Sequence, residues 1–107
     1  MAGRTVLEGY LYLVEIVDCL EPAVASEPLD TGWLLRLVEA SGVKGWMKEV
    51  VQQKLGQGVV PESVLLSMLP FAEAHRLDRT IASMKNIINI LHKYAGKKVR
   101  ITIEEID

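Results

Sequence analysis

The chain of 107 residues contains a single cysteine, Cys19, so no disulfide can form within it. A zinc site built from several cysteines is excluded for the same reason. Charged residues interrupt every apolar stretch before it reaches the roughly 18 residues that a membrane span requires. The N-terminus also lacks the charged region, apolar run and small-residue cleavage site of a secretory signal. We therefore expect a cytoplasmic protein without membrane contact.

Side chains that could carry out catalysis are also scarce. His75 follows Glu73 by two residues and precedes Asp78 by three, but the sequence suggests no further ligand that would complete a metal site. His92 has no carboxylate close to it in the sequence, and Cys19 has no neighbouring histidine to activate its thiol. The serines and glycines match no nucleophile or phosphate-binding motif. We predict no catalytic residue, metal or cofactor, and hence a protein that is not an enzyme.

What the chain does contain is enough apolar material for a core. Half of its residues are hydrophobic and 24% are charged, a balance typical of a globular protein. Its length is close to the commonest domain size. We therefore predict a single helical domain over residues 1–107, in which residues 96–107 form a C-terminal strand or tail.

The first predicted element is a helix over residues 5–20. Thr5 followed three residues later by Glu8 fits a capping box, in which each side chain accepts a hydrogen bond from the other residue's backbone amide. Behind this cap, apolar residues recur every three or four positions up to Leu20. A strand reading is weaker, because Leu11 and Leu13 would share a face with Glu15.

Three further helices are predicted from local start and stop signals. Side chains that accept hydrogen bonds mark the first turns, while glycine and proline mark the ends. Trp33 and Trp46, near the starts of two of these helices, are expected to fill the corner between them. The predicted helices run from Asp30 or Thr31 to Gly42, from Trp46 to Leu55, and from Pro61 to a kink or break at Pro70. Residues 71–77 are expected to continue helically, and Asp78 or Thr80 to cap the last helix.

The last predicted helix has the most regular pattern. Its apolar residues alternate between spacings of four and three, which is the seven-residue repeat of helices that pack against one another. The pattern is too short for a free-standing coiled coil and favours a buried helix or a helix at a subunit interface. The residues that carry it are Leu77, Ile81, Met84, Ile88, Leu91 and Ala95.

The segment after Gly96 predicts a β-strand, because Val99, Ile101 and Ile103 alternate with polar residues. An unpaired strand leaves its backbone groups unsatisfied, so this strand needs a partner. The N-terminal residues, a second copy of the tail, or another protein could supply it. We favour a second copy, because antiparallel tails would bring Lys98 and Arg100 near Glu104 and Glu105 of the other chain.

These patterns together predict a mostly α fold: a bundle of four to six short helices with a single C-terminal β-strand, paired across an oligomer interface. The predicted function is that of a small intracellular assembly or adaptor subunit. It would form a homo-oligomer, with a dimer favoured, or would bind another protein chain. The predicted interface residues are Ile88, Leu91, Tyr94, Val99, Ile101 and Ile103.

The distribution of charge supports an alternative function. The net charge is −2, yet residues 75–100 carry seven lysines and arginines against one acidic residue, Asp78. Such segregation can create a basic face for DNA or RNA, or it can let one half of the chain attract the other. A DNA- or RNA-binding accessory protein is therefore the second hypothesis. Its candidate contact residues are Arg76, Arg79, Lys85, Asn89, Lys93, Lys97, Lys98 and Arg100.

Overall fold

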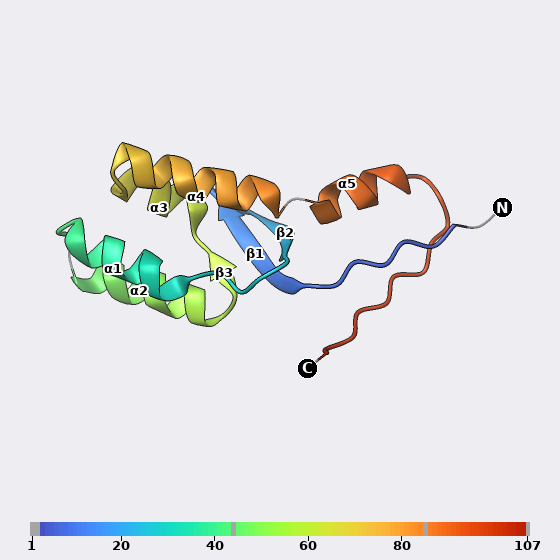
Figure 1. The fold of residues 1–107 in the computed structure, drawn as a ribbon, viewed down its shortest axis with the longest axis horizontal. Helices are drawn as coiled ribbons and strands as arrows, with labels where there is room; N and C mark the ends of the chain where they lie inside the picture. Colours follow the sequence, from blue (N-terminus) through green and yellow to red (C-terminus); the bar gives the residue numbers. More distant parts are fainter. Residues whose placement is uncertain (1–2, 44, 85, 107) are drawn as a thin grey trace.

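A computed structural model of the chain describes residues 3–43, 45–84 and 86–106. Most of the helices pack beside a small mixed β-sheet, and one helix lies apart from the others (Figure 1). The elements in chain order are β1 (Tyr10–Ile16), β2 (Cys19–Ala25), α1 (Thr31–Ala40), α2 (Gly45–Gly56), β3 (Val59–Val60), α3 (Glu62–Met68), α4 (Phe71–Ser83) and α5 (Asn86–Lys93).

The N-terminal part of the chain is a β-hairpin, so the predicted helix over residues 5–20 is wrong. β1 and β2 are antiparallel, with Tyr10 opposite Ala25 and Ile16 opposite Cys19. The mostly α helical bundle is therefore also wrong, because the fold combines helices with a three-stranded sheet. The aromatic and β-branched residues of β1 alternate onto one face of the strand, and cross-strand pairing with β2 outweighs the helical spacing of its apolar residues.

The turn of the hairpin gave no recognisable sequence signal. Two-residue hairpin turns usually contain Asn-Gly or a similar pair, whereas this turn consists of Val17 and Asp18. Val17 adopts a φ of 52°, which is unusual for a β-branched residue. Its backbone N–H donates a hydrogen bond to Ser63 Oγ at 3.0 Å. A contact 46 residues away therefore helps to hold this turn.

The sheet has the strand order β2-β1-β3, and β3 is parallel to β1. The Leu13 N–H donates to the Gly58 carbonyl at 2.9 Å at the start of β3. On the other side of the sheet, the edge of β2 is partly closed. Pro22 has no N–H to offer, and the Val24 N–H donates to the Met84 carbonyl at 2.9 Å.

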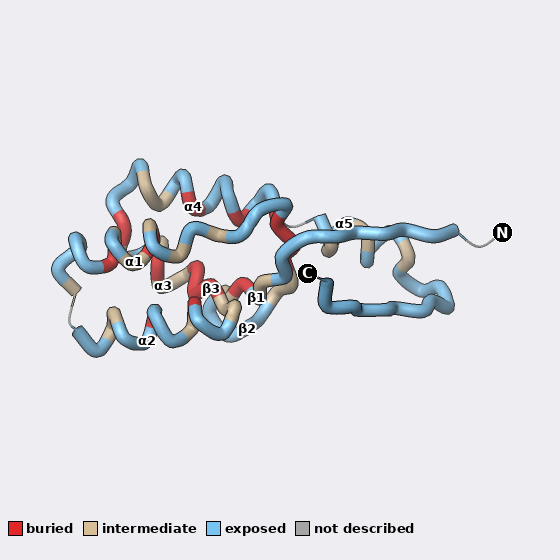
Figure 2. The backbone as a smooth tube through the Cα atoms, turned by 60° about the horizontal axis from the view of Figure 1, so that its bottom comes forward, coloured by how far each residue is buried: buried red, intermediate tan, exposed pale blue. Residues whose placement is uncertain are grey.

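The core lies between the hairpin and the helices. Val14 of β1 and Ala23 of β2 are buried on the face that the helices cover. Figure 2 shows the buried positions gathered where α1, α2, α3 and α4 approach the sheet. Fully buried side chains from these helices are Leu34, Val38, Val51, Leu65, Leu77 and Ile81. Burial of this kind stabilises a fold by about 1.5–3 kcal/mol for each large apolar side chain.

The predicted boundaries of α1 are confirmed. Asp30 is its N-cap, and the Trp33 N–H donates to Asp30 Oδ1 at 2.9 Å. Gly42 follows the helix with a φ of 74°, a conformation that glycine adopts without strain.

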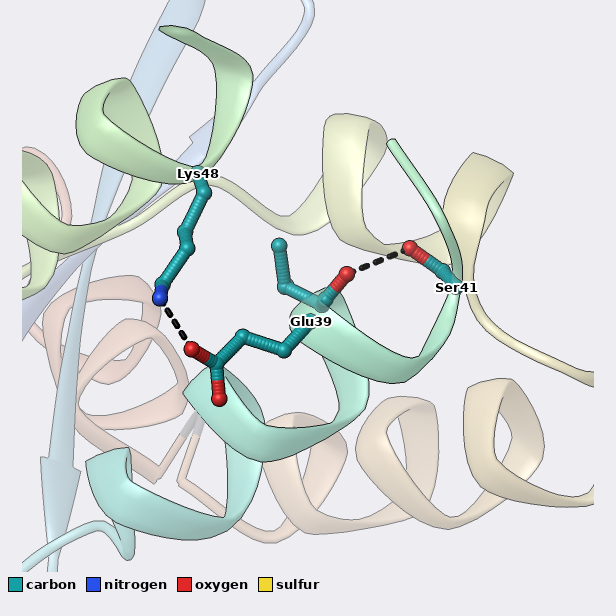
Figure 3. Close-up of polar contacts among 4 residues, drawn as sticks. Glu39, Ser41 and Lys48 are labelled. Atoms are coloured by element: carbon teal, nitrogen blue, oxygen red, sulfur yellow. Dashed lines mark hydrogen bonds and ion pairs between the residues drawn. The ribbon is translucent and has the colours of Figure 1, made fainter. Parts of the chain in front are cut away.

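The corner between α1 and α2 is held by polar contacts. Lys48 of α2 forms an ion pair with Glu39 of α1, and the Ser41 Oγ donates to the Val38 carbonyl at 2.6 Å (Figure 3). Trp33 packs against the core, but Trp46 is 59% exposed. The prediction that both tryptophans fill this corner is therefore wrong for Trp46.

Pro61 and Pro70 mark helix starts as predicted, but the last predicted helix is not continuous. Pro61 precedes α3 and Pro70 precedes α4, which confirms the break between these helices. α4 runs through Asp78 and Thr80, so the predicted cap of the last helix there is wrong. The apolar pattern from Leu77 to Ala95 is instead divided between α4 and α5. Because the Met84 carbonyl accepts from Val24 rather than from a later helical amide, the helix ends there.

The predicted C-terminal strand is also wrong. Residues 97–106 are exposed and belong to no strand. Their alternating pattern suits a strand, but a strand also requires a partner backbone. The sheet of the protomer is built from β1, β2 and β3 instead.

Candidate functional site

One end of the molecule projects away from α1, α2, α3 and α4 and the sheet that they cover (Figure 1). It consists of residues 3–9, α5 and residues 94–106, which we call the terminal arm (Figure 1). The described part of the chain measures 56 Å along its longest axis against 28 and 22 Å along the others. α5 lies against β2, yet none of its described residues is buried.

The terminal arm is held together around Tyr94. The Tyr94 hydroxyl forms a 2.7 Å hydrogen bond with the Thr5 hydroxyl, which ties the end of α5 to the N-terminal residues. The ammonium groups of Lys93 and Lys97 lie 5.8 and 6.0 Å from the centre of the Tyr94 ring. Both distances are within the range of cation–π attraction. The arm therefore has internal contacts although it buries little apolar surface.

The six predicted interface residues all lie in the terminal arm. Ile88 and Tyr94 are half-buried and Leu91 is 43% exposed. The three tail residues are more exposed, reaching 82% at Ile103. Sequence reasoning missed further exposed apolar residues of the arm, because it assigned the N-terminal ones to a helix. These are Val6, Leu7 and Ile106.

The outer face of the hairpin is a second apolar surface, which the described residues cover only in part. Leu11 and Leu13 of β1 and Leu20 of β2 are all exposed there. On the same face, Glu15 accepts a hydrogen bond from Lys54 Nζ at 2.5 Å. The outer face of the hairpin therefore adds to the apolar surface that the protomer leaves open.

The predicted nucleic-acid contacts are divided between two parts of the molecule. Arg76 and Arg79 lie on α4. Asn89 and Lys93 lie on α5, and the tail carries the other described members of the set. Lys85 lies outside the described residues. The described members of the set therefore lie on separate parts of the molecule; those in the terminal arm are Asn89, Lys93, Lys97, Lys98 and Arg100.

Two aromatic contacts accompany the arginines of α4, and sequence reasoning missed both. The Arg76 guanidinium carbon lies 4.4 Å from the centre of the Trp33 ring. The rings of Phe71 and His75 are stacked, with their centres 6.3 Å apart. Phe71, His75 and Arg79 are spaced by four residues, which places them along one face of a helix. This spacing is the signal that could have identified them.

Comparisons with known proteins add no functional assignment. No protein-family model, curated protein or solved structure matches the chain. Among the helices that the structure describes, none is long and apolar enough to cross a membrane.

Proposed function

We propose that this protein is a small, non-enzymatic assembly or adaptor subunit of the cytoplasm, which self-associates through α5 and its C-terminal residues. The observation that carries the proposal is the exposure of α5. It is strongly amphipathic in sequence, but none of its described residues is buried in the protomer. An amphipathic helix gains most of its stability from burying its apolar face against another element.

The amount of exposed apolar surface supports the same proposal. Apolar side chains of the arm and of the outer hairpin face remain open to water, among them Leu11, Leu91 and Ile101. Scattered exposed apolar residues are normal, but grouped ones are typical of interaction surfaces. Covering apolar surface contributes about 25 cal/mol for each Å² removed from water. A partner that covers the terminal arm and the outer hairpin face would therefore provide a substantial driving force for association.

A second copy of the chain is the partner that the charges favour. The tail begins with Lys97, Lys98 and Arg100 and continues with Glu104 and Glu105. When two such tails approach in opposite directions, the basic part of each meets the acidic part of the other. A two-fold interface pairs the same surface on both copies in this way. Opposite charges at the rim of an interface mainly select the partner and its orientation.

Light scattering of the purified protein tests self-association. We expect a mass of twice the 11.9 kDa of one chain, or a higher multiple. Leu91→Glu should shift the mass to that of one chain, because it introduces a charge into the apolar surface of α5. Asn89→Glu is the matched control, since Asn89 is an exposed polar residue of the same helix and should leave the oligomer intact.

Removal of the residues after Gly96 tests the contribution of the tail. The truncated protein should associate more weakly, with a dissociation constant raised at least tenfold, while its helical circular dichroism is kept. A wild-type protein with the mass of one chain at all concentrations up to about 100 µM would reject self-association, since that range covers dissociation constants of typical weak dimers. If the protein remains oligomeric with Leu91→Glu and also after the truncation, α5 and the tail are not the interface.

A further inference from the structure

The outer face of α4 carries an aromatic and basic surface that is separate from the terminal arm. The Phe71 side chain is 89% exposed, and its ring lies within 4° of parallel to the ring of His75. His75, Arg76 and Arg79 line a hollow of about 550 Å³. We call Phe71, His75, Arg76 and Arg79 the α4 ridge. The rest of the hollow is lined by the small side chains of Ala72, Thr80 and Ser83.

Arg76 is already held in place within the α4 ridge. Its guanidinium lies over the Trp33 ring, and Trp33 packs against the core from α1. Stacking uses the flat face of a guanidinium and leaves the N–H donors at its edge free to bind an anion. An arginine fixed in this way loses less conformational entropy when it binds a ligand.

The positive charge of the ridge is not neutralised by neighbouring carboxylates. Among the described residues, the ion pairs are formed by Lys48 and Lys54, and none involves Arg76 or Arg79. The acidic residues of α4, Glu73 and Asp78, do not line the hollow. Both arginines are therefore available to a negatively charged ligand.

We infer that the α4 ridge binds single-stranded nucleic acid, with bases stacked on Phe71 and phosphates bound by Arg76 and Arg79. Proteins that bind single strands combine aromatic side chains for the bases with cations for the backbone. A duplex offers only base edges in its grooves, so an exposed ring such as Phe71 would find no base face to stack on. This inference does not depend on the proposed self-association.

Fluorescence anisotropy with labelled 12-nucleotide oligo-U RNA and oligo-dT DNA tests the inference. Binding of either strand should weaken with salt, with a logarithmic slope of about −1.4 for two phosphate contacts. Phe71→Ala should weaken binding roughly 5- to 150-fold, which corresponds to the loss of one stacked base. Phe71→Tyr keeps the ring and should bind like the wild type. Arg79→Gln should make the salt slope less negative by about 0.7.

Matched controls separate the α4 ridge from other exposed groups. Trp46→Ala removes an exposed aromatic from α2, and Arg100→Gln removes a cation from the tail; neither should change binding. Because Phe71 is almost fully exposed, its substitution should leave the thermal unfolding midpoint unchanged. The inference is overturned by an absence of binding to both strands, or by equal binding to a duplex or to heparin. Wild-type affinity in Phe71→Ala or Arg79→Gln would overturn it as well.

Discussion

Replacing Gly9 with alanine gives opposite results for a hairpin and for a helix at the N-terminus. In the structure, a Cβ atom on Gly9 would lie 2.4 Å from the Ala25 carbonyl oxygen and 2.7 Å from Val24 Cγ1. The first of these atoms belongs to the backbone of β2, so it cannot rotate away. Gly9→Ala must therefore push the end of β2 away from the start of β1.

Overpacking of this kind typically costs about 1–3 kcal/mol. Each kcal/mol lowers the unfolding midpoint by roughly 4–8 °C in a domain of about this size. In a helix over residues 5–20, the same substitution would instead stabilise the protein by about 1 kcal/mol, because alanine has the higher helix propensity. The sign of the change therefore distinguishes the two structures.

Thermal unfolding followed by circular dichroism measures this difference. Gly45→Ala serves as the control, because a Cβ there meets no atom of the described residues within 4 Å beyond its chain neighbours, and Gly45 begins α2. It should leave the midpoint unchanged or raise it slightly. A Gly9→Ala protein as stable as the wild type, or more stable, would refute the close approach of Gly9 to β2.

Two further substitutions test the local geometry, both by urea unfolding. Val17→Asn should raise the free energy of unfolding by about 0.5–1 kcal/mol, because asparagine tolerates the positive φ of the turn better than valine does; a lower stability would contradict the strained turn. Asp30→Ala should lower it by about 1 kcal/mol by removing the acceptor for the Trp33 N–H, and Asp30→Asn should restore most of the loss. Equal stability of Asp30→Ala and the wild type would argue against this cap.

The helix boundaries that sequence reasoning predicted correctly depend on short-range chemistry. Asp30 caps α1 through an amide three residues later, and Gly42 adopts the left-handed conformation just beyond the helix. Pro61 and Pro70 each stand directly before a new helix, and Pro70 also prevents α3 from continuing. Such signals operate within a few residues, so they can be read from a single chain.

The errors arose where distant residues decide the structure. β1 has apolar residues on both faces, which hides the alternation that usually identifies a strand. Its partner β2 contains Pro22, which normally argues against a strand but is tolerated at a sheet edge. The sequence has no proline or glycine between α4 and α5 that would mark the break. The break coincides with the hydrogen bond from the Val24 N–H to the Met84 carbonyl.

The candidate surfaces show the same division. The apolar residues of α5 and the tail were identified from their spacing alone, since periodicity reveals which side chains share a face. Arg76 and Arg79 of the α4 ridge were among the predicted nucleic-acid contacts, but their grouping with exposed aromatic rings was missed, because one contact of the ridge joins Arg76 to Trp33 across two helices. Spacing within α4 could suggest a common face for Phe71, His75 and Arg79, but not the aromatic support beneath Arg76.

By itself, the sequence determined where α1, α3 and α4 begin, because capping side chains and prolines act on the backbone next to them. It also determined that the last part of the chain is amphipathic. Only the tertiary structure decided that residues 10–25 form a hairpin, that the final helix is divided, and that the tail lies outside the sheet. The hairpin turn is held by a hydrogen bond from Val17 to Ser63, and the helix break coincides with one from Val24 to Met84. No local pattern records which of these groups will meet.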